Sequence, residues 1–163
     1  MNLGTLTGDR FNLARFLVAQ EGVWPAARAE IASGRKRGHW MWFIFPQLAG
    51  LGRSAMADRY AIGSLEEAQA YLAHPVLGAR LREAVATLQD VTGTTADVMF
   101  GPVDAMKLRS SLTLYIRAGA PPLFSAALAR WFGGQMDERT LALLRDGGAE
   151  SGPVDDGTAA PAP

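Results

Sequence analysis

Hydrophobic residues recur at helical spacing along most of the chain, and glycine or proline separates one such stretch from the next. Asp9 is suited to cap the first helix, and Ser64 with Glu67 forms a capping box at another. Pro102 is placed to open a helix, because proline is favoured in the first turn. The pattern predicts about seven helices, with approximate ranges 11–17, 24–34, 64–74, 75–92, 102–117, 121–133 and 137–144.

Strand composition is confined to Trp40–Phe45, which is apolar at every position. Because a lone strand has no pairing partner, we expect this stretch to be a buried short helix or an extended segment. Any helix at Asp97–Phe100 is expected to have one turn at most. The sequence therefore predicts an all-α fold, a compact orthogonal bundle with little or no sheet.

The length of 163 residues fits a single domain. Residues 147–163 contain no aromatic and no basic residue but carry Glu150, Asp155 and Asp156. Because this composition offers little apolar surface to bury, we expect a disordered acidic tail. The helical domain is expected to comprise residues 1–146.

Composition excludes several classes of site. The chain has no cysteine, which excludes disulfides, thiolate metal sites and cysteine nucleophiles. Its 16 basic and 16 acidic residues give no net charge, so overall charge indicates neither nucleic acid nor an anionic membrane as a partner. His39 and His74 are too isolated to indicate a metal site, and no motif indicates a cofactor. Without a secretory signal or a long apolar run, we expect a cytoplasmic protein.

Residues 35–54 combine cations with aromatic side chains. One interpretation is a core anchor preceded by a solvated basic turn. Another is a pocket for a planar anionic ligand such as a nucleotide, in which Arg35 and Lys36 hold phosphate and Trp40 and Trp42 form an apolar wall. A third is a patch that binds protein. Gly50–Ala55 matches a dinucleotide-binding pattern, but we reject that function because the required parallel sheet is not predicted.

The helix from Pro102 carries a polar stripe that includes Asp104, Lys107 and Ser111. The stripe is explained either by an Asp104–Lys107 pair near the helix N-terminus or by one wall of a site. In a site, Lys107 would bind phosphate and Asp104 would act as a base or accept a hydrogen bond from a hydroxyl group. His39 is the best further candidate for acid–base chemistry. Neutral hydrogen bonds to a ligand would come from Gln47, Ser110 and Ser111.

Three stretches carry a resemblance to a known family: GRKRGHWMWFIFPQLAGLGRS, YLAHPVLGARL and FGPVDAMKLRSSLTLY. The chain resembles, over residues 10–145, the bacterial domain-of-unknown-function family that many genome annotations mislabel "calpastatin". The resemblance implies a compact, mainly helical single domain. Calpastatins themselves are long, repetitive and disordered, so that label does not suit this aromatic-rich chain.

The order of the segments is also similar, in arrangement only, to an ADP-ribose-linked superfamily that includes relatives of a swarming-motility protein. This likeness implies a nucleotide-like or ADP-ribose-linked phosphate ligand. If a glycosidic bond is hydrolysed, Asp104 is the expected carboxylate near the developing oxocarbenium ion. Two alternatives stay open: a non-catalytic module that binds protein or RNA through residues 35–45, or a purely structural segment with the site elsewhere.

Overall fold

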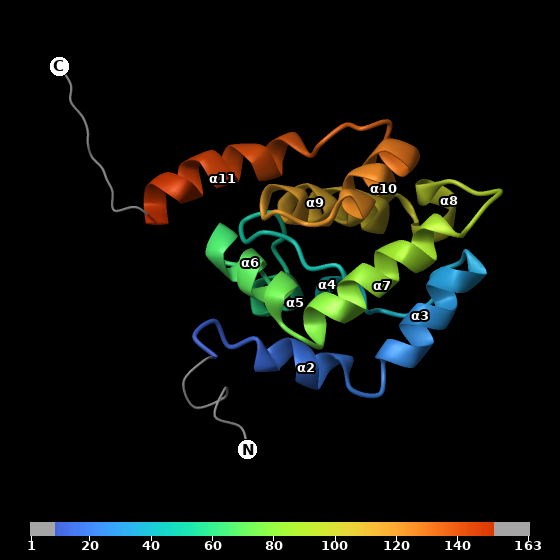
Figure 1. Ribbon diagram of the computed structural model, residues 1–163, viewed down its shortest axis with the longest axis horizontal. Coiled ribbons are helices and arrows are strands. Elements are labelled where there is room, and N and C mark those ends of the chain that lie inside the picture. Colours follow the sequence, from blue (N-terminus) through green and yellow to red (C-terminus); the bar gives the residue numbers. More distant parts are fainter. Residues whose placement is uncertain (1–8, 152–163) are drawn as a thin grey trace.

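The computed structural model describes residues 9–151, which contain ten helices and no strand (Figure 1). The longer helices are α2 (Ala14–Gln20), α3 (Trp24–Ser33), α6 (Leu65–Ala73), α7 (Leu77–Gln89), α9 (Pro102–Arg117), α10 (Pro122–Phe132) and α11 (Glu138–Ser151). Short helices are α4 (Met41–Ile44), α5 (Ala55–Arg59) and α8 (Ala96–Phe100). The all-α prediction is therefore confirmed, and the helices form a single compact domain.

The expected number of about seven helices was wrong, because α4, α5 and α8 were not counted as helices. Each has only four or five residues, too few to show a helical repeat in the sequence. Local caps fix two of them: the Ser54 hydroxyl accepts from Ala57 N at 3.0 Å, and the Thr95 hydroxyl accepts from Val98 N at 3.2 Å.

The last helix runs further than the sequence suggested. It was expected to end near Leu144, whereas α11 continues to Ser151, into the segment expected to be an acidic tail. The remainder of that segment, 152–163, lies outside the described residues, as do residues 1–8.

Helix α9 lies in the middle of the fold, with α11 and α2 on opposite sides of the view in Figure 1. It packs against α4, α6, α8, α10 and α11. Residues 110–115 are buried without interruption, which shows that this part of the helix is enclosed on all sides. Two of its buried hydroxyl groups bond back to the helix, since Ser110 donates to Met106 O and Thr113 to Arg109 O, whereas Ser111 Oγ has no hydrogen-bond partner among the described residues.

The apolar stretch around α4 is part of the core. The side chains of Trp40, Met41, Phe43, Ile44 and Phe45 are buried, as the core-anchor interpretation expected. The Trp40 ring lies edge-on to Phe100, with ring centroids 6.5 Å apart. The chain that follows α4 is fixed by an isolated parallel bridge between Leu48 and Ile62, the only strand-like pairing within residues 9–151.

An ion pair between Arg15 and Glu67 ties α2 to the start of α6, with Nη2 2.9 Å from Oε2. Arg15 also donates to the backbone carbonyls of Phe11, Asn12, Arg59 and Ala61. Ser64 caps α6 as predicted, since its hydroxyl accepts from Glu67 N, while Glu67 Oε1 accepts from Gly63 N, one residue before the N–H that a capping box would use. The pair is therefore almost fully satisfied by hydrogen bonds, as a largely buried ion pair requires.

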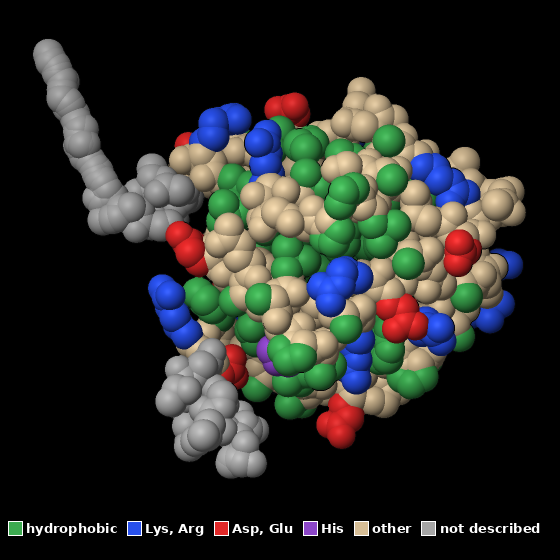
Figure 2. All heavy atoms as spheres, in the orientation of Figure 1, with side chains coloured by type: hydrophobic (Ala, Val, Ile, Leu, Met, Phe, Trp, Pro, Cys, Tyr) green, Lys and Arg blue, Asp and Glu red, His purple; other side chains and the backbone are tan. Residues whose placement is uncertain are grey.

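Basic and acidic side chains are interspersed over the face shown in Figure 2, in keeping with the balanced charge of the chain. No helix described between residues 9 and 151 is long and apolar enough to cross a membrane.

The His74 ring accepts hydrogen bonds between the end of α6 and the beginning of α7, and these bonds depend on its protonation state. Its Nδ1 accepts from Val76 N at 3.1 Å and from Leu77 N at 3.2 Å, which requires an unprotonated nitrogen. Burial lowers the pKa of His74 below its ordinary value, against the opposing effect of the Asp9 charge.

We therefore expect His74 to make stability depend on pH. Since folding favours the neutral ring, its contribution is present above the ordinary histidine pKa of about 6.5 and is lost as the pH falls below that value. Replacement by asparagine (His74→Asn) keeps an acceptor that does not titrate. Thermal unfolding at pH 7.5 and pH 5.0 should show a larger loss of Tm for the wild type than for His74→Asn. Equal losses would contradict this role.

Candidate functional site

The structure places the basic–aromatic segment against α9, around the carboxylate of Asp104. Lys36 Nζ lies 2.9 Å from Asp104 Oδ2, and Lys107 Nζ lies 3.3 Å from Asp104 Oδ1. Lys107 Nζ also lies 4.7 Å from the centre of the Trp42 ring. Residues that the sequence proposed from two distant segments therefore meet, and we call Lys36, Trp42, Asp104 and Lys107 the Asp104 cluster.

Lys36 is the buried member of this cluster, with 8% of its side chain exposed. Besides the Asp104 carboxylate, its ammonium group contacts the carbonyl oxygen of Gly38 and lies 4.9 Å from the centre of the Trp40 ring. Its backbone N–H donates to Met99 O at 3.0 Å. These contacts offset the cost of burying a charge, so Lys36 fastens the loop before α4 to α8 and α9.

Glu30 on α3 organises the same loop and was not singled out from the sequence. Its Oε1 accepts from Arg37 N at 2.7 Å, Gly38 N at 2.8 Å and Trp40 Nε1 at 2.9 Å. Burial by itself raises the pKa of the Glu30 carboxyl, but these hydrogen bonds and the nearby Lys36 charge outweigh it and hold the pKa below its ordinary value. The loop and the Trp40 indole are therefore held in one position by an ionised carboxylate.

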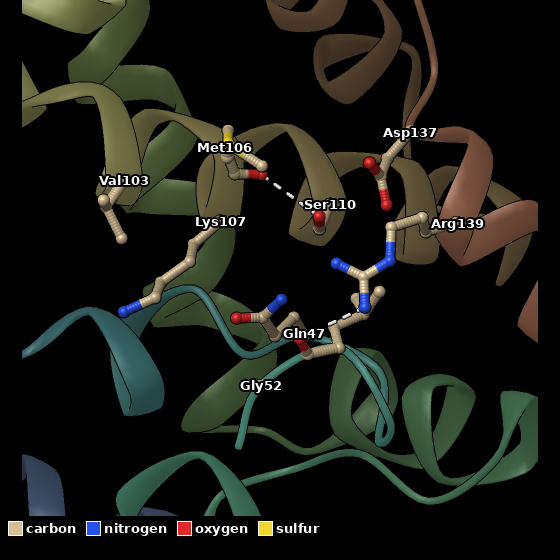
Figure 3. A pocket seen from close by; sticks show the side chains of 9 residues that line it. Gln47, Gly52, Val103, Met106, Lys107, Ser110, Asp137 and Arg139 are labelled. Atoms are coloured by element: carbon tan, nitrogen blue, oxygen red, sulfur yellow. Dashed lines mark hydrogen bonds between the residues drawn. The ribbon is translucent and has the colours of Figure 1, made fainter. Parts of the chain in front are cut away.

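A pocket of about 310 Å³ opens next to Lys107 (Figure 3). Three segments line it: the loop after α4, one face of α9 and the beginning of α11. The lining residues are Gln47, Leu51, Gly52, Val103, Met106, Lys107, Ser110, Asp137 and Arg139.

The beginning of α11 is attached to α9 beneath this pocket. Asp137 N donates to the Thr113 hydroxyl at 2.9 Å, and Asp137 Oδ2 accepts from Thr140 N at 2.9 Å and from the Thr140 hydroxyl at 2.5 Å. Asp137 therefore caps α11, as the sequence predicted for this position. The attachment places Arg139, two residues later, on the pocket wall.

The pocket combines cations with an apolar wall. Lys107 and Arg139 lie on either side of the Gln47 amide in Figure 3. Arg139 Nη2 donates to Leu51 O over 3.4 Å, a long hydrogen bond. Val103 and Met106 are 65% and 56% exposed, which is high for large hydrophobic side chains. A small organic molecule with an anionic group fits such a lining.

The structure separates the residues proposed from the sequence into groups. Those that line the pocket are Gln47, Lys107 and Ser110. Three others do not line the pocket but are connected to its lining residue Lys107 within the Asp104 cluster: Lys36, Trp42 and Asp104. Those outside the pocket lining are Arg35 and His39, which are exposed, and Trp40 and Ser111, which are buried in the core.

Two charged lining residues, Asp137 and Arg139, were not proposed as site residues. The sequence identified Asp137 as a helix cap, and this role is confirmed. Arg139 has no distinguishing sequence pattern, because one exposed arginine in a first helical turn is unremarkable by itself. Its importance depends on how α11 packs against α9, which no local motif encodes.

Comparison with known proteins identifies relatives of the whole domain. A family model described as "Protein of unknown function (DUF1810)" matches residues 10–144. The crystal structure of the conserved hypothetical protein Rv1873 from Mycobacterium tuberculosis is similar with a TM-score of 0.82 and 53% sequence identity. The similarity covers 84% of this chain and 99% of that chain. No match was found among curated proteins.

Removal of the Asp104 carboxylate, which Lys36 and Lys107 share, should destabilise the fold because Lys36 is buried. We expect Asp104→Ala to lower the free energy of unfolding by roughly 3 kcal/mol, because it leaves a buried ammonium group without its counterion. The matched control Lys107→Ala removes only the more exposed partner and should cost about 0.5 kcal/mol or less. Urea denaturation measures both values.

A compensating variant checks that the buried charge is the cause. The double replacement Lys36→Met with Asp104→Leu should recover most of the stability lost in Asp104→Ala, because the only charge it leaves unpaired is that of the more exposed Lys107. Equal destabilisation by Asp104→Ala and Lys107→Ala would show that the Lys36 pair does not hold the loop.

Proposed function

The chain belongs to the family of proteins of unknown function DUF1810. We propose that it binds a small phosphate-bearing organic molecule in the pocket beside Lys107. The ligand is of the nucleotide or sugar-phosphate type. The observation that carries the proposal is the position of Lys107, a cation on the pocket wall. Its only carboxylate partner within residues 9–151 is Asp104, which also pairs with Lys36.

The Asp104 cluster has an excess of positive charge. Two ammonium groups share one carboxylate, and the closer contact belongs to Lys36 at 2.9 Å, against 3.3 Å for Lys107. Lys107 is 22% exposed and its ammonium group has three N–H donors. An arriving phosphate would find there a positive charge that Asp104 only partly neutralises, in an environment where solvent screens charges less than in bulk water.

Arg139 supplies a second cation from another element. A guanidinium group presents a planar set of donors that matches phosphate and carboxylate oxygens. Gln47 adds an amide that can donate or accept. The carbon skeleton of the ligand would rest on Leu51, Val103 and Met106.

Hydrolysis of a glycosidic bond is not part of this proposal. Asp104, the carboxylate suggested for that chemistry, already contacts two ammonium groups, and Asp137 caps α11. His39 lies outside the pocket lining. The geometry therefore supports binding.

The alternative function, binding of protein or RNA through residues 35–45, would use a different surface. Most aromatic side chains of this segment are buried, which leaves Arg35, Arg37 and His39 as its exposed groups. This surface shares no residue with the pocket lining, so substitutions can distinguish the two functions.

Binding of AMP and of inorganic phosphate, measured by calorimetric titration, should depend on the pocket cations. We expect Lys107→Ala to weaken binding about tenfold to a hundredfold, since it removes a charged hydrogen bond to the anion, and Arg139→Ala to weaken it less, since Arg139 lies at the other end of the pocket. Arg117→Ala is the matched control, because Arg117 is an exposed cation at the far end of the same helix. It should bind like the wild type.

Several results would contradict the proposal. One is the absence of binding by both probes, and another is an equal loss in Arg117→Ala and Lys107→Ala. A loss caused by Arg35→Ala or Arg37→Ala, with Lys107→Ala unaffected, would favour the exposed basic loop instead.

A further inference from the structure

The two ends of the pocket differ in the hydrogen bonds that they offer. The end at Lys107 is cationic. The other end is lined by Ser110, Asp137 and Arg139, whose guanidinium extends toward Gln47 in Figure 3, so donors and acceptors occur together. A phosphate suits the first environment, and a group that both donates and accepts suits the second.

At the end of the pocket lined by Arg139, two acceptor groups can still accept hydrogen bonds. Asp137 has only 10% of its side chain exposed, and its Oδ2 is occupied by Thr140. For Oδ1 the only cation within 4 Å in the described part of the chain is Arg109, whose Nη2 lies 3.9 Å away, too far for a hydrogen bond. This carboxylate oxygen belongs to a residue of the pocket wall and accepts no hydrogen bond from the described residues, so it is free to accept one from a ligand.

Ser110 points to the same kind of ligand group. Its hydroxyl donates to Met106 O at 3.1 Å, so that only its lone pairs are left for a ligand. Asp137 Oδ1 and Ser110 Oγ, both on residues that line the pocket, are therefore free to accept a hydrogen bond. A neutral hydroxyl fits better than an ammonium group, because Arg109 and Arg139 already bring two positive charges to this end.

The size of the pocket limits the rest of the ligand. A volume of about 310 Å³ lies at the lower end of the range of roughly 300–1,000 Å³ for small-molecule sites. One ring with one phosphate fits this volume, whereas the two linked nucleosides of a dinucleotide exceed it.

We infer that the ligand is a monophosphate of a hydroxylated ring, of the size of a pentose phosphate. Its phosphate binds at Lys107, and its ring hydroxyl groups donate to Asp137 Oδ1 and Ser110 Oγ. This inference rests on the proposed function, because it assigns the ligand class of the same pocket. Asp137 and Ser110 are then the residues that distinguish a sugar phosphate from phosphate alone.

Calorimetric titration with ribose 5-phosphate and with inorganic phosphate tests the assignment. The wild type should bind ribose 5-phosphate at least tenfold more tightly than inorganic phosphate, and ADP-ribose no more tightly than ribose 5-phosphate. Asp137→Asn keeps an oxygen for the helix cap but replaces one acceptor by a donor. It should remove most of the preference for the sugar phosphate while the affinity for inorganic phosphate changes by less than about twofold.

Ser110→Ala provides a second variant without a role in capping, and it should lower the same preference if Asp137→Asn fails to fold. Lys107→Ala should weaken both probes. Equal affinity for the two probes in the wild type would overturn the ligand class and leave the proposed phosphate site standing. An unchanged preference in both Asp137→Asn and Ser110→Ala would overturn the roles of these residues, and binding of neither probe would overturn the proposed function as well.

Discussion

The ammonium group of Lys36 is buried where the loop before α4 meets α9, and its contact with Asp104 is the interaction on which the neighbouring structure depends. A charge inside a protein is tolerated only when its partners stay in place, so this contact fixes the loop relative to α9. Glu30 holds the other side of the loop through two backbone N–H groups and the Trp40 indole. The aromatic side chains that follow can then occupy the core without a strand or a long helix to carry them.

The pocket follows from this arrangement together with the attachment of α11. Once α4 is fixed, the chain after it passes beside α9 and brings Gln47 near Lys107. On the opposite side, the hydrogen bond from Asp137 N to Thr113 sets the beginning of α11 against the same helix. Helix α9 is therefore both the centre of the core and one wall of the pocket. Its small hydroxyl residues allow the close packing and leave acceptors at the pocket.

Much of the fold could be predicted because its signals are local. Capping residues, prolines in first turns and glycines after last turns mark the longer helices, and the Ser64 cap predicted for α6 is present. Helices of one turn, such as α4 and α8, carry no repeat and depend on burial and single caps. Lengths of short elements therefore could not be derived from periodicity.

The site could be predicted only in part, for a physical reason. Lys36 and Lys107 look alike in the sequence, yet one is buried in an ion pair and the other lies on a pocket wall, a difference that arises only from tertiary packing. Trp40 and Trp42 differ in the same way: the first is held in the core by Glu30, and the second lies under the Lys107 ammonium group. Arg139 reaches the pocket because α11 is anchored to α9, which the sequence does not reveal.

The most direct test is a ¹H–¹⁵N spectrum of the tryptophan indole groups during titration with ribose 5-phosphate. If the phosphate binds Lys107, the ammonium group moves relative to the Trp42 ring, so the Trp42 indole signal should shift with added ligand. The Trp40 signal should stay in place, because its indole donates to Glu30 inside the loop. A constant Trp42 signal, with shifts confined to the backbone of residues 35–39 or with none at all, would contradict binding at this pocket.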